Sequence, residues 1–324
     1  MEITRSPNRL DNFRVRLPAC DQFVRSCVDT KLGTSVRLAT GKSIEFPLPF
    51  FWFDPPWHLV PIEKCRTFAH AFAASGIVVS SLHRDLAADE ENKTAWFLPR
   101  LAPHRCDRAG WTFRDFESAS VIDLRLAPIR DEIGRFAYHP AQLNRWRNFE
   151  EDRSHDAVDA TDAMTFPPDW KNVDSMCSKV GQLRRLSDAA IFVSIDEVHA
   201  PVMLLAAKAA DVDGVIIRVE GDPLQTIVRA RQQIDSWKRP ISTALWVVTS
   251  EQLSPVDCVK CFAMGASGLS VDLICNDLLF QNHLRLEAAV NQVVGELADS
   301  VRGYANSCNV AQITDLRPDH LGIV

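Results

Sequence analysis

Two similar segments in the C-terminal half of the chain limit its fold more than any other feature. Ala210–Ile217 and Met264–Val271 each follow a helix-like amphipathic run, pass through glycine and open a strand-like run. This punctuation is typical of a repeating strand–helix unit whose strands lie parallel in a buried sheet. Helix-like and strand-like runs alternate without a break from Val173 to Leu273. The pattern predicts an α/β fold, a single (β/α)8 TIM barrel of eight parallel strands.

The expected elements follow from the hydrophobic period and from the prolines and glycines that bound each run. Strands are expected at residues 46–53, 77–81, 121–126, 163–166, 190–195, 214–219, 242–248 and 268–273. Helices are expected at residues 62–74, 173–186, 201–210, 224–237, 255–264 and 284–307.

The length of 324 residues suits one large domain with additions. Residues 46–324 are expected to form the barrel, and residues 1–45 an extended N-terminal segment that packs on one end of it. Residues 128–165 are polar and too long for a turn, so they are expected as an insertion before the fourth strand. This insertion is interpreted either as an excursion over the barrel mouth or as a partly mobile segment.

Composition excludes several classes of protein. The net charge of −6 gives no reason to expect a nucleic-acid partner. The absence of a long apolar stretch predicts a chain that does not cross a membrane and is cytoplasmic. The nine cysteines are odd in number and scattered, which favours reduced thiols over a disulfide framework.

Several short motifs, in the order in which they occur, resemble the FMN-binding barrel domain of the glutamate synthases. The nearest type is the barrel subunit of the methylamine, or N-methylglutamate, synthases. The resemblance rests on Cys27–Gly33, Leu48–Phe51, Phe166–Trp170, Cys258–Ala266 and Leu316–Leu321. It implies an FMN-dependent oxidoreductase of glutamate or amino-nitrogen metabolism that works with a partner subunit or as a homo-oligomer.

The chain departs from this family at the positions that would hold the flavin. Bulky residues, Trp52–Trp57, stand where the family has small ones, and Ser194 stands where it has a basic residue. Acidic loops, Glu220–Pro223 and Val247–Glu251, replace the glycine-rich phosphate loops. The family-equivalent cofactor-binding candidates are Ser194, Thr249 and Ser250. The iron–sulfur cysteines have no counterpart after the last strand, so no cluster is expected.

Candidate catalytic residues are sought at the carboxyl ends of the strands, where barrel enzymes place their chemistry. The densest cluster, Asp196, Glu197 and His199, contains residue types that carry out acid–base work, and no metal site is assigned to it. The other polar residues at predicted strand ends are Asp54, His58, His83, Arg84, Asp85, Arg125, Glu220, Asp222 and Asp272.

Four residues within predicted elements, two arginines and two cysteines, have more than one interpretation. Arg125 and Arg218 lie in apolar strands, where they form either a salt bridge to Asp123, Glu220 or Asp222 or an anion clamp at the mouth. The Cys-x-x-Cys of Cys258 and Cys261 lies in a helix pattern without a second pair. It therefore predicts two buried core thiols.

Three classes of function remain open. The first is an oxidoreductase that reduces an imine to an amino acid with electrons that pass through FMN. The second is a non-catalytic scaffold or regulatory partner of an active paralogue. The third is an enzyme whose mouth uses Asp, Glu and His side chains for a metal or a different ligand. The departures together predict a degenerate, inactive flavin site and a protein that purifies without stoichiometric FMN.

Overall fold

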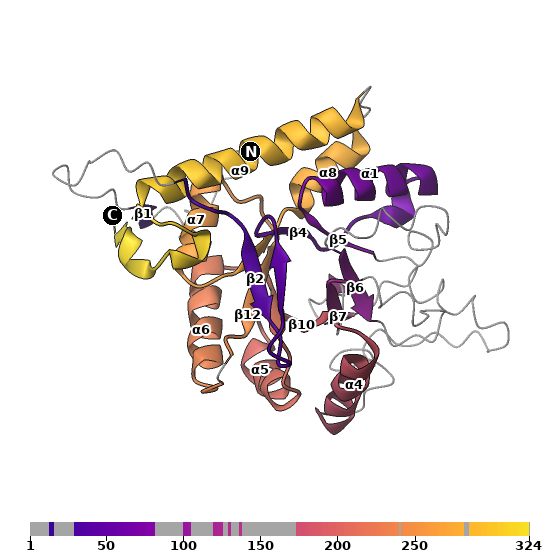
Figure 1. The fold of residues 1–324 in the computed structure, drawn as a ribbon, viewed down its shortest axis with the longest axis vertical. Helices are drawn as coiled ribbons and strands as arrows, with labels where there is room; N and C mark the ends of the chain where they lie inside the picture. The colour runs from indigo at the N-terminus through magenta and orange to yellow at the C-terminus, as the bar shows by residue number, and fades with distance from the viewer. Residues whose placement is uncertain are drawn as a thin grey trace, which may run out of the picture.

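The structure is a closed barrel of eight parallel strands surrounded by helices, as the sequence predicts (Figure 1). The computed structural model describes residues 13–15, 29–81, 100–104, 119–125, 129–130, 136–137, 173–239, 241–281 and 285–323. The barrel strands in order are β4 (Phe50–Trp52), β5 (Val78–Ser80), β6 (Arg100–His104), β7 (Val121–Arg125), β10 (Ala190–Asp196), β11 (Gly214–Val219), β12 (Ala244–Thr249) and β13 (Gly268–Ser270).

The assignment of the third and fourth strands from sequence is wrong. The third strand is β6, which begins at Arg100 and contains Pro103, and these residues break the apolar run by which a buried strand is recognised. The predicted third strand, β7, pairs in parallel with β6 and β10 and is therefore the fourth. The insertion consequently follows the fourth strand. The strand predicted at residues 163–166 lies outside the described residues.

Helices occupy the connections where the apolar period predicts them. They are α1 (Ile62–Ala74), α4 (Val173–Leu186), α5 (Ala200–Ala209), α6 (Pro223–Asp235), α7 (Pro255–Ala263), α8 (Asp272–Phe280) and α9 (Leu286–Ser307). The short helix α8 is a correction, because a strand was predicted to continue to residue 273. The last strand ends at Ser270, and the chain turns into a helix at Asp272.

The smaller elements lie outside the barrel ring. Two antiparallel pairs, β1 (Phe13–Val15) with β14 (Leu321–Ile323) and β8 (Ile129–Arg130) with β9 (Phe136–Ala137), flank it. The 3-10 helices are η3 (Trp57–Leu59), η7 (Ile313–Asp315) and η8 (Pro318–His320). In the described part of the chain, no helix has both the length and the apolar character that a membrane span needs.

The barrel interior is a packed aromatic core. The rings of Phe51, Phe192 and Phe46 lie against Trp246, with centroid distances of 4.7, 4.8 and 5.5 Å. Outside the strands, Trp52 and its neighbours pack beneath α1. The aromatic residues in and directly after β4, Phe50–Phe53, are therefore core packing.

A hairpin closes the N-terminal end of the barrel. Strands β2 (Thr34–Arg37) and β3 (Ser43–Phe46) pair antiparallel and cross this end in front of the barrel strands (Figure 1). The buried carboxylate of Asp213, just before β11, accepts hydrogen bonds from the amides of Ala39 and Ile191 at 2.8 and 2.9 Å. The hairpin is thereby fixed to two barrel strands at this end.

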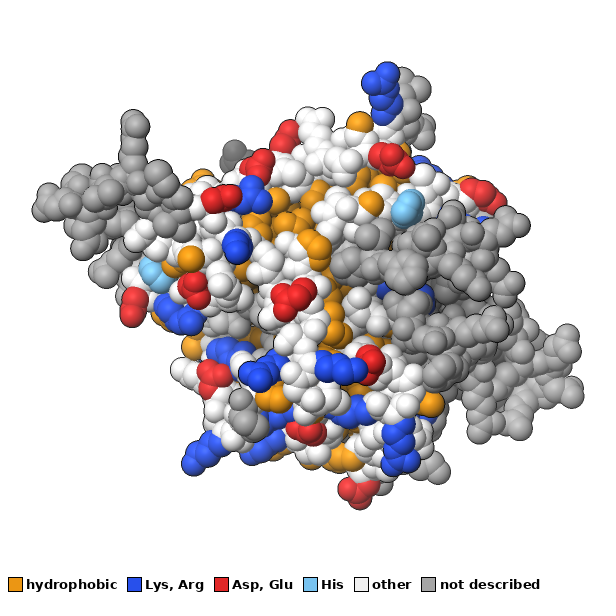
Figure 2. Space-filling view, viewed as in Figure 1, with side chains coloured by type: hydrophobic (Ala, Val, Ile, Leu, Met, Phe, Trp, Pro, Cys, Tyr) orange, Lys and Arg blue, Asp and Glu red, His pale blue; other side chains and the backbone are white. Residues whose placement is uncertain are grey.

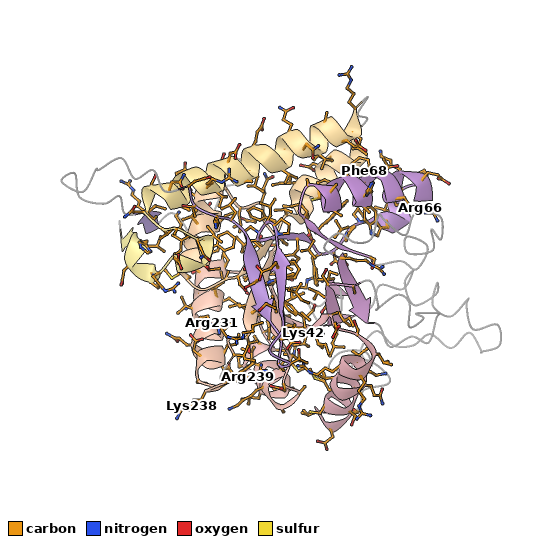
Figure 3. The ribbon with its side chains drawn as sticks, viewed as in Figure 1. Lys42, Arg66, Phe68, Arg231, Lys238 and Arg239 are labelled. Carbon is orange, nitrogen blue, oxygen red and sulfur yellow. The ribbon has the colours of Figure 1, made fainter. Side chains whose placement is uncertain are left out.

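The basic residues on this closed face have structural partners. Figure 2 shows Lys and Arg side chains gathered on the lower part of the face. Lys42, Arg231 and Arg239, labelled in Figure 3, pair with Asp188, Asp235 and Asp211. These cations hold connecting segments together, so the face is not the candidate ligand site.

Candidate functional site

The open end of the barrel carries a layer of polar side chains above the aromatic core. Residues alternate between the two faces of a strand, so the inward Val121, Phe192 and Ile216 predict inward positions two residues later. Those positions are Asp123, Ser194 and Arg218. The strand register places Phe192 beside Asp123 and Asp196 beside Arg218. The polar layer therefore lies where the parallel strands end, at the barrel mouth.

Ser194 faces a buried carboxylate and not open space. Its hydroxyl donates a short hydrogen bond to the Asp123 carboxylate, and both side chains are buried. A buried carboxylate needs hydrogen-bond donors, and Ser194 supplies one. Ser194 thus stabilises the layer beneath the mouth, and its role as a direct cofactor ligand stays a prediction.

Arg218 reaches across the mouth to the end of the first strand. Its Nη1 lies 3.4 Å from Oδ2 of Asp54, and its guanidinium lies 5.9 Å from the centre of the Phe53 ring. Strands β12 and β13 lie between β11 and β4 in the barrel, so this ion pair spans part of the opening. Both side chains remain about one quarter exposed. Asp54 is not among the three acidic residues expected from sequence, because it lies on a segment far from Arg218 in the chain.

Asp272 fixes the backbone that carries Asp54. Its two carboxylate oxygens accept hydrogen bonds from the amides of Phe53 and Asp54 at 2.7 and 3.0 Å. Burial, and then the negative charge of Asp54, raise the pKa of Asp272 from 3.8 to about 7. The two amides and Arg218 act in the opposite direction. Near neutral pH this carboxyl group can therefore hold or release a proton.

His199 and Asp196 form a pair that can move a proton. Oδ2 of Asp196 lies 2.6 Å from Nδ1 of His199, and Oδ1 accepts the His199 amide at 2.7 Å. Asp196 is buried, whereas half of the His199 side chain is exposed. A carboxylate that accepts the Nδ1 proton leaves Nε2 as the basic atom, directed away from the carboxylate. This arrangement suits a general base.

Glu197 and Asp222 have structural roles. The carboxylate of Glu197 accepts from the Gly221 amide at 3.1 Å and from the Thr226 hydroxyl at 3.4 Å, so it joins β10 to the next loop. Asp222 is the N-cap of α6 and accepts from the amides of Leu224 and Gln225. Of the predicted catalytic cluster, Asp196 and His199 lie together, and Glu197 is directed toward the neighbouring loop.

The remaining predicted residues are distributed differently. Residues 83–85, the side chain of Arg125 and that of His58 lie outside the described part of the structure. Glu220 and Ser250 are exposed after their strands. The side chains of Cys258 and Cys261 are buried, as predicted, and burial raises the pKa of Cys258 to about 12. Among the described residues, no three His, Cys, Asp or Glu side chains are grouped to hold a metal ion.

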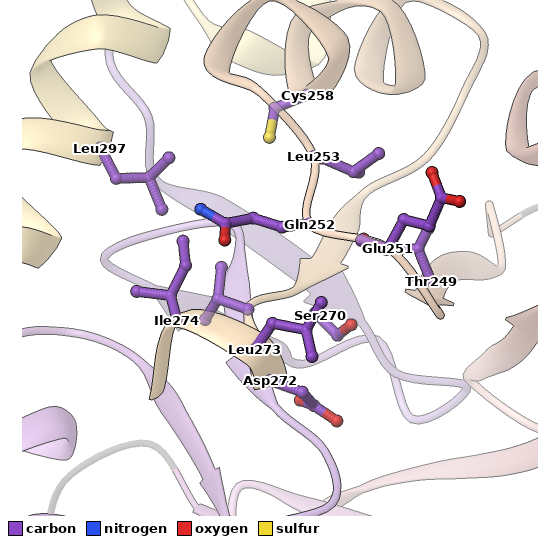
Figure 4. A pocket seen from close by; sticks show the side chains of 11 residues that line it. Thr249, Glu251, Gln252, Leu253, Cys258, Ser270, Asp272, Leu273, Ile274 and Leu297 are labelled. Atoms are coloured by element: carbon purple, nitrogen blue, oxygen red, sulfur yellow. The ribbon is translucent and has the colours of Figure 1, made fainter. Parts of the chain in front are cut away.

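A small pocket lies between the loops after the seventh and eighth strands, and its free space of about 10 Å³ has room for roughly one water molecule (Figure 4). Its lining includes Thr249, Gln252 and Ser270 together with apolar side chains from α7, α8 and α9. Figure 4 shows the carboxylates of Glu251 and Asp272 pointing away from Gln252. The loops after strands seven and eight, with a short extra helix, are where barrels of this kind often bind phosphate.

The donors in this pocket suit a phosphate group, although they are uncharged. The cap residue of α8, Val271, makes no side-chain capping bond, so the first-turn amides of α8 are available to an anion. The Gln252 amide and the Ser270 hydroxyl add neutral donors. The lining contains no Lys or Arg. Because Glu251 and Asp272 also line the pocket, only neutral hydrogen bonds and the helix dipole would hold the phosphate of FMN there, against two acidic side chains.

Sequence analysis missed Asp123, Gln252 and Ser270 as members of the site. Asp123 has a recognisable signal, since it is an acid at the inward position of an otherwise apolar strand. Gln252 and Ser270 have no distinctive motif, and only the closure of β12 and β13 into one barrel brings them together.

Fold and site together define a closed parallel α/β barrel with a polar mouth and a pocket beside its last two strands. Solved structures of this architecture match nearly the whole chain. One is an active mutant of (S)-mandelate dehydrogenase, which is 15% identical to this chain. The match covers 97% of this chain and 89% of the dehydrogenase chain, with a TM-score of 0.63. A soluble mutant of the membrane-associated (S)-mandelate dehydrogenase from Pseudomonas putida matches with 16% identity, coverages of 97% and 88%, and a TM-score of 0.61.

A third similar structure carries an FMN adduct. It is a mandelate oxidase mutant with a monooxide FMN adduct, at 14% identity, coverages of 97% and 88%, and a TM-score of 0.60. At such identities the likeness establishes the fold. No protein-family model and no curated protein matches the chain. The glutamate synthase resemblance therefore remains an expectation from sequence.

Proposed function

We propose that the protein is an oxidoreductase that acts with FMN on a small organic acid at the barrel mouth. The observation that carries the proposal is the pairing of His199 with buried Asp196 at the same end of the barrel as Arg218. The fold supports it, because the similar structures include a mandelate oxidase with an FMN adduct.

The chain's own residues supply three functions in this proposal. Arg218 binds the carboxylate of the substrate, since guanidinium groups match carboxylates in geometry and charge. Nε2 of His199 takes the proton from the hydroxyl or amino group next to that carboxylate, and Asp196 stabilises the resulting imidazolium. Phe53 and the packed core below it exclude water from the layer beneath the mouth.

The phosphate of FMN would be held by Gln252, Ser270 and the first-turn amides of α8, whereas the Thr249 hydroxyl donates to the Glu251 carbonyl at 2.8 Å. When bound, FMN supplies a two-electron acceptor or donor. Each charge-assisted hydrogen bond that a Lys or Arg would have added is worth about 1.5–3 kcal/mol, or roughly 10- to 150-fold in affinity. We therefore expect weak FMN binding and a protein that loses the flavin during purification.

Small organic acids include the substrates of both reactions considered so far, the oxidation of a hydroxy acid and the glutamate-type reaction. Mandelate is a hydroxy acid whose carboxylate adjoins the reacting carbon, and the glutamate-type reaction implied by the resemblance places an amino nitrogen at the same position. The partner subunit or second copy implied by that resemblance is a further proposal. Light scattering of the purified protein tests for a second copy.

Titration with FMN and with riboflavin tests the cofactor proposal. Quenching of flavin fluorescence should show FMN binding in the micromolar range or weaker, and riboflavin, which lacks the phosphate, should bind less tightly. Gln252→Leu should reduce the preference for FMN, and Gln292→Leu, an exposed glutamine on α9, is the matched control. Equal binding of both flavins would contradict the assigned phosphate pocket.

Anaerobic bleaching of the bound flavin tests the proposed base. With FMN loaded at saturating concentration, a hydroxy or amino acid substrate should bleach the visible absorbance in the unchanged protein. His199→Asn should lower that rate by roughly 10²- to 10⁴-fold while FMN affinity is kept. Similar bleaching rates in both proteins would exclude His199 as the base.

A non-catalytic ligand-binding barrel is the second candidate function. The lack of a Lys or Arg in the phosphate pocket favours it. Undetectable FMN binding at millimolar concentration, together with retained binding of carboxylates at the mouth, would support this candidate over the oxidoreductase.

A further inference from the structure

The ion pair across the mouth joins Arg218, in strand β11, to Asp54, in the loop after strand β4. Arg218 belongs to β11, whose position is fixed by ladders to β10 and β12. Asp54 follows the end of β4 and precedes two prolines. The Nη1–Oδ2 distance of 3.4 Å is longer than the 2.7–2.9 Å of a tight charge-assisted hydrogen bond. The strand ladders thus hold the arginine in place, and its ion pair with Asp54 is longer than a tight charge-assisted hydrogen bond.

The surroundings of Arg218 remain suited to an anion if Asp54 moves away. The Phe53 ring lies under the guanidinium at 5.9 Å and supports its orientation by a cation–π contact. Asp196, the register partner of Arg218, has both carboxylate oxygens bound to His199. Since Arg218 is about one quarter exposed, a small ligand can approach it from solvent.

We propose that Asp54 occupies the place of a ligand carboxylate, and that a small carboxylic acid binds at the mouth by displacing Asp54 from Arg218. The bond exchange is simple: one Arg218–carboxylate ion pair breaks and an equivalent one forms. In the free protein, Asp54 therefore acts as an internal competitor that weakens binding and excludes neutral molecules. The inference names the substrate class of the proposed oxidoreductase, but the exchange itself requires no flavin.

The exchange has a consequence for protons. Burial and the negative charge of Asp54 raise the pKa of Asp272, and Arg218 offsets part of this effect. When a ligand carboxylate takes over Arg218, Asp272 loses part of that compensation and should take up a proton more readily. The other titratable groups near Asp272 are Glu251 in the pocket lining and Cys275 on α8, and the pKa of Cys275 is already raised by burial.

Calorimetric titration of the flavin-free, full-length protein tests the exchange. The probes are acetate, glycolate and (S)-mandelate, each compared with its uncharged amide. An ion pair of this exposure contributes about 0.2–1 kcal/mol, so Asp54→Asn should tighten acid binding by roughly 1.5- to 5-fold. Glu220→Gln is the matched control, because it removes one exposed acid beside Arg218. It should change the affinity less than Asp54→Asn does.

Two additional variants complete the test. Arg218→Gln should reduce acid binding at least tenfold, and Arg218→Lys should retain part of it because the charge remains. Titration in two buffers with different ionisation heats should show proton uptake at pH 7 that Asp272→Asn diminishes. Circular dichroism confirms that each variant is folded.

Three results would overturn the inference. They are unchanged acid affinity in Asp54→Asn, equal binding of acids and amides, and no acid binding to either protein at tens of millimolar. The flavin titration is read separately, so failure of the exchange leaves the cofactor proposal standing, and failure of FMN binding leaves the exchange standing.

Discussion

Gly214 provides a quantitative test of how tightly the barrel interior is packed. A Cβ atom added to Gly214 would lie 2.3 Å from Cζ of the Phe192 ring and 2.5 Å from two other ring carbons. Carbon atoms in contact normally lie about 3.5–4.0 Å apart, so the ring would have to move by more than 1 Å. Phe192 is fully buried, and its ring stands edge-on to Trp246 at 4.8 Å. The ring therefore has little room to move.

We expect Gly214→Ala to destabilise the protein by about 3 kcal/mol, the upper part of the usual range for overpacked cores. For a chain of this size, the midpoint of thermal unfolding should fall by roughly 5–10 °C. Urea unfolding followed by tryptophan fluorescence and by circular dichroism measures the change in free energy, provided that both signals give the same transition.

Gly295→Ala is the matched control. Gly295 lies within α9, and an added Cβ would meet nothing within 4 Å. Replacement of a helical glycine by alanine should stabilise the protein by about 0.5–1 kcal/mol. The double variant Gly214→Ala with Phe192→Leu should lose less stability than the sum of its single changes. If Gly214→Ala is as stable as Gly295→Ala, or if the double variant shows no coupling, the interior packing described here is wrong.

Three more predictions concern named interactions. The pKa of Asp272 is raised to about 7, so the folded protein holds a proton that the unfolded chain releases above pH 4. Stability should therefore fall by on the order of 2–4 kcal/mol between pH 4 and 7, and urea unfolding of Asp272→Asn should show a flatter profile over that range. Ser194→Ala removes a donor to the Asp123 carboxylate and should cost about 1–3 kcal/mol, against less than about 0.5 kcal/mol for exposed Ser250→Ala, both measured by thermal unfolding. Asp213→Ala removes the acceptor that fixes the hairpin and should lower the free energy of unfolding by about 3–5 kcal/mol in the same assay. The control Asp188→Ala, at an exposed position, should lower it by less than about 1 kcal/mol. Equal effects of the two variants would contradict the role of Asp213 in fixing the hairpin.

The helices and strands from residue 173 onward could be predicted because their apolar period is regular. Helix α4 and strand β11 match the expected bounds at both ends. The strand that begins at Arg100 was missed because its side chains do not follow that period. Arg100 is fully buried beside Ser81, whose hydroxyl accepts its Nε at 3.0 Å, and a sequence gives no sign of such a distant partner.

The sequence by itself determined the barrel class and identified Asp196 and His199 as neighbours. Both follow from local spacing, since parallel strands end at one edge and the two residues are three positions apart. Only the tertiary structure decided that Arg218 pairs with Asp54, that Asp272 supports the same loop, and that Ser194 binds Asp123. The members of each pair are separated by more than 70 positions in the chain. Ser194 and Asp123 meet because β10 pairs with β7, and the contacts of Asp54 and Asp272 form because the first and last strands close the ring.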